Sequence, residues 1–250
     1  MTKETFVTIG VLALQGAFIE HENHLKLAVS KLQLSGENKL IQVPVNIIEV
    51  RTPEELEKCD ALIIPGGEST AISLVAERTG LLGPLRDFVK IQKKPVWGTC
   101  AGMILLAEQA TRTKKDGQEL IGGLNIRVRR NHFGRQTESF SQKLTLPVVG
   151  KEPFECVFIR APVVETILEG ELKTNTADEL VSAPASNVND EEKDENRVKV
   201  LGWLPGKDGQ ADVVVAVQQH NIVGTSFHPE LTNDTRLHEW WITEVLKTVE

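Results

Sequence analysis

Hydrophobic and polar positions in the first half of the chain alternate between strand-length apolar runs and helical patterns. Phe6–Leu14 is apolar on both faces, which is typical of a central strand in a parallel sheet. Three later runs have the same character: Val45–Val50, Ala61–Ile64 and Pro95–Trp97. Strands that alternate with helices at this spacing predict a parallel sheet covered by helices on both faces.

A predicted helix follows each of these strands. Thr52 fits an N-cap, since Pro53 suits the first helical position and acidic residues fill the first turn. Gly80 fits the end of the third helix. The first helix is expected to begin after Gln15-Gly16-Ala17, and the second at Thr52-Pro53. The third is expected to begin at a cap formed by Ser69 or Thr70. The fourth is expected over Ala101–Ala110.

The second half contains short strand-like segments with few helices between them. These segments suggest antiparallel strands added to the sheet edge, followed by a C-terminal helix from about Asp234 to Thr248. The segments are Leu124–Arg129, Phe140–Leu146, Val157–Ile159, Val198–Trp203, Asp212–Gln218 and Ile222–Phe227. The predicted fold class is α/β with three layers: a mainly parallel central sheet, helices on both faces and antiparallel additions, in one domain over residues 1–250.

Charge and hydropathy exclude several classes of protein. The 250 residues include 28 basic and 35 acidic side chains, a net charge of −7, which argues against phosphate-binding surfaces for nucleic acid. No apolar stretch approaches the roughly 20 residues that span a bilayer, and the N-terminus lacks the basic region of a targeting signal. We expect a soluble, cytoplasmic protein with no nucleic-acid or membrane partner.

One polar segment, Ser182–Lys199, differs in composition from its surroundings. Its centre, Asp190–Glu195, has five acidic residues and one lysine. This composition predicts a flexible acidic insertion at about residues 182–199, with a docking segment for a partner as the alternative.

The strongest chemical motif is Gly98-Thr99-Cys100-Ala101-Gly102, which follows a predicted strand and opens a predicted helix. This is the setting of a nucleophile elbow, in which two glycines permit a tight turn that exposes the nucleophile. A helix N-terminus beneath the Cys100 sulfur favours the reactive thiolate, and the Ala101 N–H would point toward a developing oxyanion. The alternative is a buried structural cysteine in a glycine-rich turn.

The other two cysteines, Cys59 and Cys156, lack this setting and are predicted to be packed thiols. Three cysteines at wide spacing fit a reducing compartment, and none lies in a CxxC zinc pattern. We expect neither a metal nor a cofactor.

A thiol nucleophile needs a base and a group that orients the base. His228 follows an apolar run, and Glu230 lies two residues further on, so both side chains would share one side of an extended chain. The Glu230 carboxylate could then hold the imidazole tautomer. The remaining histidines are predicted to be structural: His21, His24, His132, His220 and His238.

A third motif, Pro65-Gly66-Gly67-Glu68-Ser69-Thr70, follows a predicted strand. Consecutive glycines expose backbone N–H groups and let a ligand approach closely. The alternative is a simple tight connection, and the stretch lacks the Lys-Ser/Thr ending of a phosphate-binding loop.

These three motifs, in this order, resemble class I glutamine amidotransferases with a Cys-His-Glu triad, a family of flavodoxin-like fold. Further stretches make the chain similar to the glutaminase subunits of pyridoxal 5′-phosphate synthase. The resemblance spans roughly residues 6–168 and 212–246, with extra length around residues 31–44 and 170–209. The stretches are Gly10–Ala17, Pro65–Thr70, Gly98–Gly102, Arg130–Gln136, Phe158–Pro162 and Ser226–Leu231.

The resemblance implies a reaction and a role for each residue. Cys100 would attack the side-chain amide of L-glutamine, with His228 as base and then acid, and Glu230 would orient His228. Ala101 and Gly67 would hold the oxyanion, Gly67 after a flip of the Gly66-Gly67 peptide when a synthase subunit docks. Ammonia would then pass to that subunit within a hetero-oligomer. The implied glutamine-binding residues are Gly67, Glu68, Ser69, Arg130, Ile159 and Arg160.

Two alternatives stay open at this point. One is another cysteine hydrolase of related fold, such as a γ-glutamyl hydrolase, against which the Arg130–Gln136 and Phe158–Pro162 stretches argue. The other is a non-enzymatic regulator, which the intact set of Cys100, His228 and Glu230 disfavours.

Overall fold

A computed structural model describes residues 6–35, 43–111, 118–130, 139–168, 180–184, 197–206 and 209–249. The strands are β1 Val7–Leu12, β2 Val45–Val50, β3 Ala61–Ile64, β4 Val96–Thr99, β5 Ala107–Thr111, β6 Leu124–Arg129, β7 Ser139–Leu144, β8 Phe154–Ile159, β9 Val163–Ile167, β10 Leu180–Ser182, β11 Lys199–Leu204, β12 Val213–Gln219 and β13 Ile222–Thr225. The helices are α1 Phe18–Ser35, α2 Pro53–Leu56, α3 Ser69–Arg78, α4 Leu82–Arg86, α5 Ala101–Leu106 and α6 Arg236–Thr248. Three short helical turns are η2 Asp87–Ile91, η3 Pro147–Val149 and η4 Pro229–Leu231.

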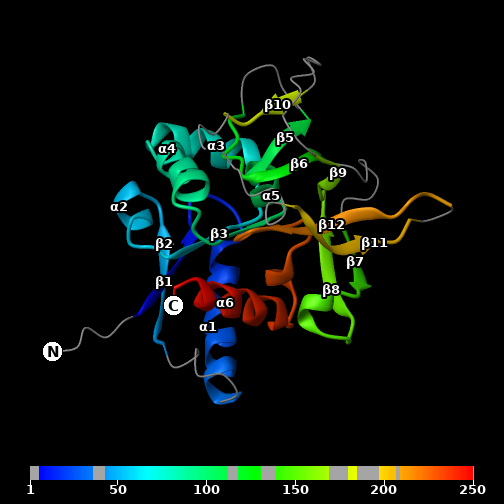
Figure 1. The fold of residues 1–250 in the computed structure, drawn as a ribbon, viewed down its shortest axis with the longest axis horizontal. Coiled ribbons are helices and arrows are strands. Elements are labelled where there is room, and N and C mark those ends of the chain that lie inside the picture. The colour runs from blue at the N-terminus through cyan, green and yellow to red at the C-terminus, as the bar shows by residue number, and fades with distance from the viewer. Residues whose placement is uncertain are drawn as a thin grey trace.

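Eleven of these strands form one sheet, in the order β10-β5-β6-β9-β12-β13-β4-β3-β1-β2, with β11 beside β12. The part from β13 to β2 is parallel throughout. Alternate side chains enter opposite cores: Ile63 packs on the side of α1 and α6, and Leu62 and Ile64 pack on the side of α2 to α5. Figure 1 shows α1 and α6 on one side of the sheet and α3 and α4 on the other. The predicted α/β class, with helices on both faces, is confirmed.

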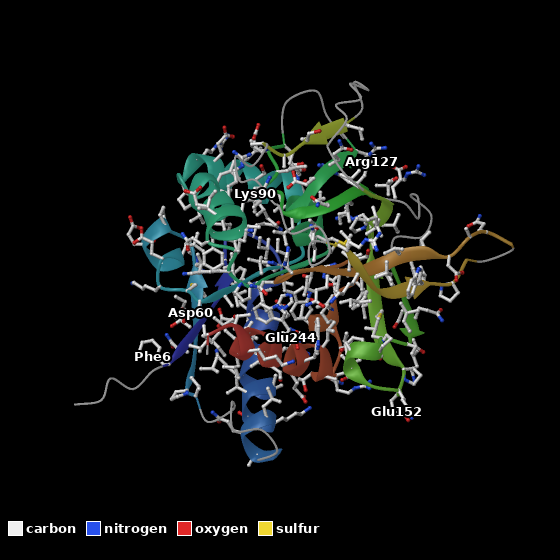
Figure 2. The ribbon with its side chains drawn as sticks, in the orientation of Figure 1. Phe6, Asp60, Lys90, Arg127, Glu152 and Glu244 are labelled. Carbon is white, nitrogen blue, oxygen red and sulfur yellow. The ribbon has the colours of Figure 1, made fainter. Side chains whose placement is uncertain are left out.

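Two side-chain interactions stabilise this half of the sheet, one at the start of a helix and one between two strands. Thr52 and Glu55 form a reciprocal capping box at the start of α2, which confirms the predicted N-cap. Asp60, labelled in Figure 2, lies just before β3 and accepts a hydrogen bond from Thr8 N at 2.8 Å. This bond joins the start of β3 to β1 where the two strands pair.

The predicted placement of the second-half strands is partly wrong. The strand in Ile222–Phe227 is not an edge addition, because β13 pairs in parallel with β4 in the middle of the sheet. The segments Phe140–Leu146 and Val157–Ile159 lie in a separate two-stranded sheet, β7-β8, which packs on the α1–α6 side. Strands β9 and β10 were not predicted. Local patterns identify strands but carry no information about distant pairing partners.

Two predicted helix boundaries are also wrong. The helix predicted over Ala101–Ala110 ends at Leu106, and the next residues form β5, in register with β6 and β10. Tertiary pairing therefore overrides the local preference of an apolar, alanine-containing segment. Helix α3 is capped by Glu68, whose carboxylate accepts from Thr70 N and Ala71 N at 3.0 and 2.7 Å.

The predicted acidic insertion falls mainly on residues 185–196, which lie outside the described residues. Within the described ranges, none of the helices has the length and apolar character that a membrane span requires.

Candidate active site

Four neighbouring parallel strands, β1, β3, β4 and β13, end at one edge of the sheet. The segments that follow them contain Gln15, the glycine pair Gly66-Gly67, Cys100 and His228, respectively. Carboxyl ends of parallel strands are where open α/β sheets place their ligand sites. The topology thus brings all three predicted motifs to one place.

Cys100 lies on a sharp turn between β4 and α5. Its φ of +49° is uncommon for a residue with a side chain and costs on the order of 1–3 kcal/mol. Two backbone hydrogen bonds hold it: Cys100 N donates to Thr225 O at 2.7 Å, and Cys100 O accepts from Ile104 N at 3.2 Å. The predicted elbow is therefore present in the structure.

The two elbow glycines allow close packing rather than an unusual φ. A Cβ on Gly102 would lie 2.0 Å from Ile64 O, and one on Gly98 would lie 2.5 Å from the Gly102 carbonyl carbon. Neither position tolerates a side chain, because the contacts are with backbone. The turn itself is made by Cys100, in contrast to the sequence-based expectation.

His228 lies between the thiol and a carboxylate. Its Nδ1 is 2.7 Å from Glu230 Oε1, and the Cys100 side chain on the other side interacts with it strongly enough to raise its pKa. His228 N also donates to Val157 O at 2.8 Å, which fixes the segment against β8. Glu230 does not lie on an extended chain as predicted: it belongs to the turn η4, which returns its carboxylate to the ring.

The surroundings favour a charged His228–Glu230 pair. Burial opposes protonation of His228, but the hydrogen bonds and negative charge of Cys100 and Glu230 outweigh it and raise its pKa to about 10. Burial also acts against the Glu230 carboxylate, yet the neighbouring His21 and His228 keep its pKa below the ordinary value. A protonated His228 next to Cys100 is placed to exchange a proton during a reaction at the sulfur.

The second Glu230 oxygen contacts a residue that the sequence did not single out. His21 Nε2 of α1 is 3.3 Å from Glu230 Oε2 and 3.1 Å from Thr99 Oγ1. His21 is fully buried, as a structural histidine is expected to be, but it also touches the predicted triad. Its position five residues after Gly16, in the segment that follows β1, is the one sequence feature that places it near this sheet edge.

The glycine loop lies against the ring of His228. A Cβ on Gly66 would be 2.2 Å from His228 Cε1, so only glycine fits there. Gly66 O accepts from Ala17 N at 3.0 Å, and Glu68 N donates to Gln15 Oε1 at 2.7 Å. Contacts from the β1–α1 connection therefore hold the loop.

Among the remaining predicted site residues, Ile159 is the one that approaches the nucleophile directly. Ile159 O is 3.9 Å from Cys100 Sγ, and Ser69 donates to Gln118 Oε1 at 3.1 Å. Arg130 is largely buried, which lowers its pKa to about 10 against the opposing charge of Glu68. Arg160 is exposed with a φ of +44°.

The other two cysteines are packed in the two hydrophobic cores. Cys59 and Cys156 are buried free thiols, and burial raises the pKa of both, that of Cys59 to about 12. The packed-thiol prediction for them is confirmed. His132 falls outside the described residues. In the described part of the chain, no group of three or more His, Cys, Asp or Glu side chains is arranged to hold a metal ion.

Comparison with known proteins agrees with this arrangement. The model of the SNO glutamine amidotransferase family matches residues 11–187 and 181–247. The pyridoxal 5′-phosphate synthase subunit SNO1 of Saccharomyces cerevisiae is 44% identical over 98% of this chain and 95% of its own. The synthase subunit PdxT of Pyrococcus horikoshii is 40% identical over 95% and 99%. A crystal structure of a glutamine amidotransferase, 37% identical, superimposes with a TM-score of 0.68 over 96% of this chain and 98% of that one. The chain belongs to the SNO glutamine amidotransferase family.

Proposed function

We propose that Cys100, His228 and Glu230 are the catalytic triad with which this glutamine amidotransferase of pyridoxal 5′-phosphate synthesis hydrolyses L-glutamine. The observation that carries the proposal is the buried His228, which interacts electrostatically with Cys100 and whose Nδ1 is 2.7 Å from Glu230 Oε1. This is the arrangement of nucleophile, base and orienting group that covalent catalysis needs.

The reaction proceeds in two stages. The Cys100 thiolate adds to the side-chain amide carbonyl of glutamine, and the His228 imidazolium gives its proton to the departing nitrogen, which leaves as ammonia. The acyl group remains on Cys100 as a thioester. Water then attacks the thioester, His228 takes a proton from that water, and glutamate leaves as the thiolate is restored.

The oxyanion formed at each stage needs two donors. Ala101 N–H is the first backbone amide of α5, directly after the nucleophile. Gly67 N–H is the second donor, after a flip of the Gly66-Gly67 peptide. That flip would break the bond from Ala17 N to Gly66 O, a backbone hydrogen bond worth about 0.5–1.5 kcal/mol. Docking of a partner can supply a free energy of this size.

We propose a glutamine-binding site that includes one arginine and one acid for the charged groups of the substrate. Arginine suits the substrate α-carboxylate and an acid suits its α-ammonium. We assign these contacts to Arg130 and Glu68, whose charges influence each other. Gly67, Ser69, Ile159 and Arg160 complete the proposed site.

The similar proteins from yeast and Pyrococcus are named as subunits of pyridoxal 5′-phosphate synthase. We propose that this chain likewise passes its ammonia to a separate synthase subunit in a hetero-oligomer. The cytoplasmic location stays a prediction.

Glutamate release, measured with and without a synthase subunit, tests this function. We expect turnover of L-glutamine, activation by the synthase, and little turnover of γ-glutamyl peptides. Preference for the peptides would favour a γ-glutamyl hydrolase instead. Gly67→Ala should reduce the activation factor, since its Cβ would lie 2.5 Å from Gln15 Oε1 and restrict the peptide that flips. An unchanged factor in this variant would contradict the proposed flip.

A further inference from the structure

We propose that His21 is a positioning residue that fixes the Glu230 carboxylate through its Nε2–H, with His238 as the partner of its other ring nitrogen. The inference rests on the proposed triad, because it assigns a task to a neighbour of Glu230. It extends the triad by a buried chain that runs from Glu230 through His21 of α1 to His238 of α6.

The contacts of His21 define this chain. Its Nε2 faces Glu230 Oε2 at 3.3 Å and Thr99 Oγ1 at 3.1 Å, and its Nδ1 is 3.0 Å from His238 Nε2. Neither the His21 nor the Glu230 side chain is exposed (0% for both). Each ring nitrogen of His21 thus has a polar neighbour in a site closed to solvent.

Protonation of the neighbours determines the direction of these bonds. Burial lowers the pKa of His21 to about 4 and that of His238 well below its ordinary value, so both rings are neutral at pH 7. An ionised Glu230 only accepts hydrogen bonds, and it therefore favours the tautomer of His21 with its proton on Nε2. Nδ1 of His21 is then an acceptor, and it receives the Nε2–H of His238.

This arrangement uses both oxygens of Glu230. Oε1 is 2.7 Å from His228 Nδ1, while Oε2 is buried, has no hydrogen-bond partner among the described residues and lies 3.3 Å from His21 Nε2. In the proposed arrangement Oε2 accepts from His21 Nε2–H, so the carboxylate cannot rotate without losing one of its two neighbours. A fixed carboxylate holds the imidazole of His228 in place beside Cys100.

The titratable groups packed around this chain come from four elements. They are Glu20, His21 and His24 of α1, Cys100 of the elbow, His228 and Glu230 at η4, and His238 of α6. His24 packs against His238 with ring centroids 4.9 Å apart, and its nitrogens face Glu20 O and Thr232 O. His24 therefore belongs to the same cluster, but its ring nitrogens face backbone carbonyls and not the carboxylate, which makes it a matched control.

The test measures the reactivity of the Cys100 thiol against pH. Iodoacetamide alkylates thiolates, and peptide mass analysis distinguishes a label at Cys100 from one at Cys59 or Cys156, which are also buried. In His21→Leu we expect the acid limb of the alkylation profile to move to higher pH, because Glu230 loses an N–H that stabilises its charged form. We also expect kcat to fall by about tenfold or more and KM to change by less than about twofold.

Three further variants separate positioning from packing. His24→Leu should leave the acid limb where it is. His21→Gln retains a donor near the Nε2 position and should restore the wild-type limb, whereas His21→Asn places its amide near Nδ1 and should not. If His21→Leu does not fold, the comparison of Gln with Asn decides.

Three results would overturn the role of His21. The acid limb of the Cys100 alkylation profile could stay in place in folded His21→Leu, or it could shift equally in His24→Leu. The alkylation profiles of His21→Gln and His21→Asn could also be identical. A wild-type Cys100 without rapid alkylation would instead overturn the triad itself. The two failures are therefore distinguishable.

Discussion

The two sides of Cys100 are built differently. On one side, His228, Glu230, His21 and Thr99 are buried and joined by hydrogen bonds and ion pairs. On the other side, Gly67, Glu68 and Gln15 are exposed. The proton-transfer side is thus enclosed and paired, while the proposed oxyanion side is an exposed loop that contains two consecutive glycines.

The difference follows from where each side lies in the fold. The base and its partners pack between the sheet and the α1–α6 layer. Moving a charged side chain there would leave buried polar groups without hydrogen-bond partners, which costs free energy. The glycine loop is held mainly through the backbone, by Ala17 N–H and the Gln15 side chain. Under the proposed partner-dependent flip, docking would change the glycine loop and leave the base and its neighbours in place.

The largest expected effect comes from removing the nucleophile. Cys100→Ala should lower glutaminase activity by roughly 10⁴-fold or more, because no thioester can form. Glutamate release in the presence of the synthase subunit measures this. Cys59→Ala and Cys156→Ala are the controls and should turn over nearly normally. If Cys100→Ala retained a tenth of wild-type activity, Cys100 would not be the nucleophile, and the two sides of Cys100 would not be parts of an active site.

Removing the charge that orients the base should have the next largest effect. Glu230→Gln should lower kcat by roughly 10²-fold or more and change KM much less, since Glu230 contacts His228 and not the proposed substrate site. Steady-state kinetics with L-glutamine measure both constants. An effect confined to KM would place Glu230 outside the triad.

A methyl group at the boundary between the two sides tests how rigid the base is. In Gly66→Ala the Cβ would lie 2.2 Å from His228 Cε1, so the ring must move away from Glu230 or Cys100. A displacement of this size should lower kcat by about 10²-fold. Gly83→Ala is the matched control, because nothing lies within 4 Å of its Cβ. Normal activity in Gly66→Ala would show that the base side adapts as readily as the loop.

The smallest expected effect is on stability against pH. The folded-state pKa of His228 is about 10, above its ordinary value of 6.5, so its stabilising contribution is complete below pH 6.5 and is lost as pH rises through 10. The difference in Tm between the wild type and His228→Asn should therefore narrow between pH 7 and pH 10. His220→Asn, in an exposed turn where φ is +49°, should show no such trend. If the difference in Tm widened as pH rises, the prediction that folded His228 is protonated at pH 7 would be wrong.

The sequence by itself determined the chemistry of this protein. A strand followed by Gly-x-Cys-x-Gly and an apolar helix is a local pattern, and so are His228 and Glu230 two residues apart. Local patterns depend on backbone sterics and spacing, which act within a few residues. The alternation of strands and helices around the first four strands was predictable for the same reason.

Only the tertiary structure decided which distant segments meet. The place of β13 beside β4, the ending of α5 at Leu106 and the contact of His21 with Glu230 all depend on pairing between remote parts of the chain. His21 and His238 lie 217 positions apart, and either one alone reads as an ordinary core histidine. Such contacts form because distant segments pack together in the buried core, so the residues next to each histidine in the sequence do not predict them.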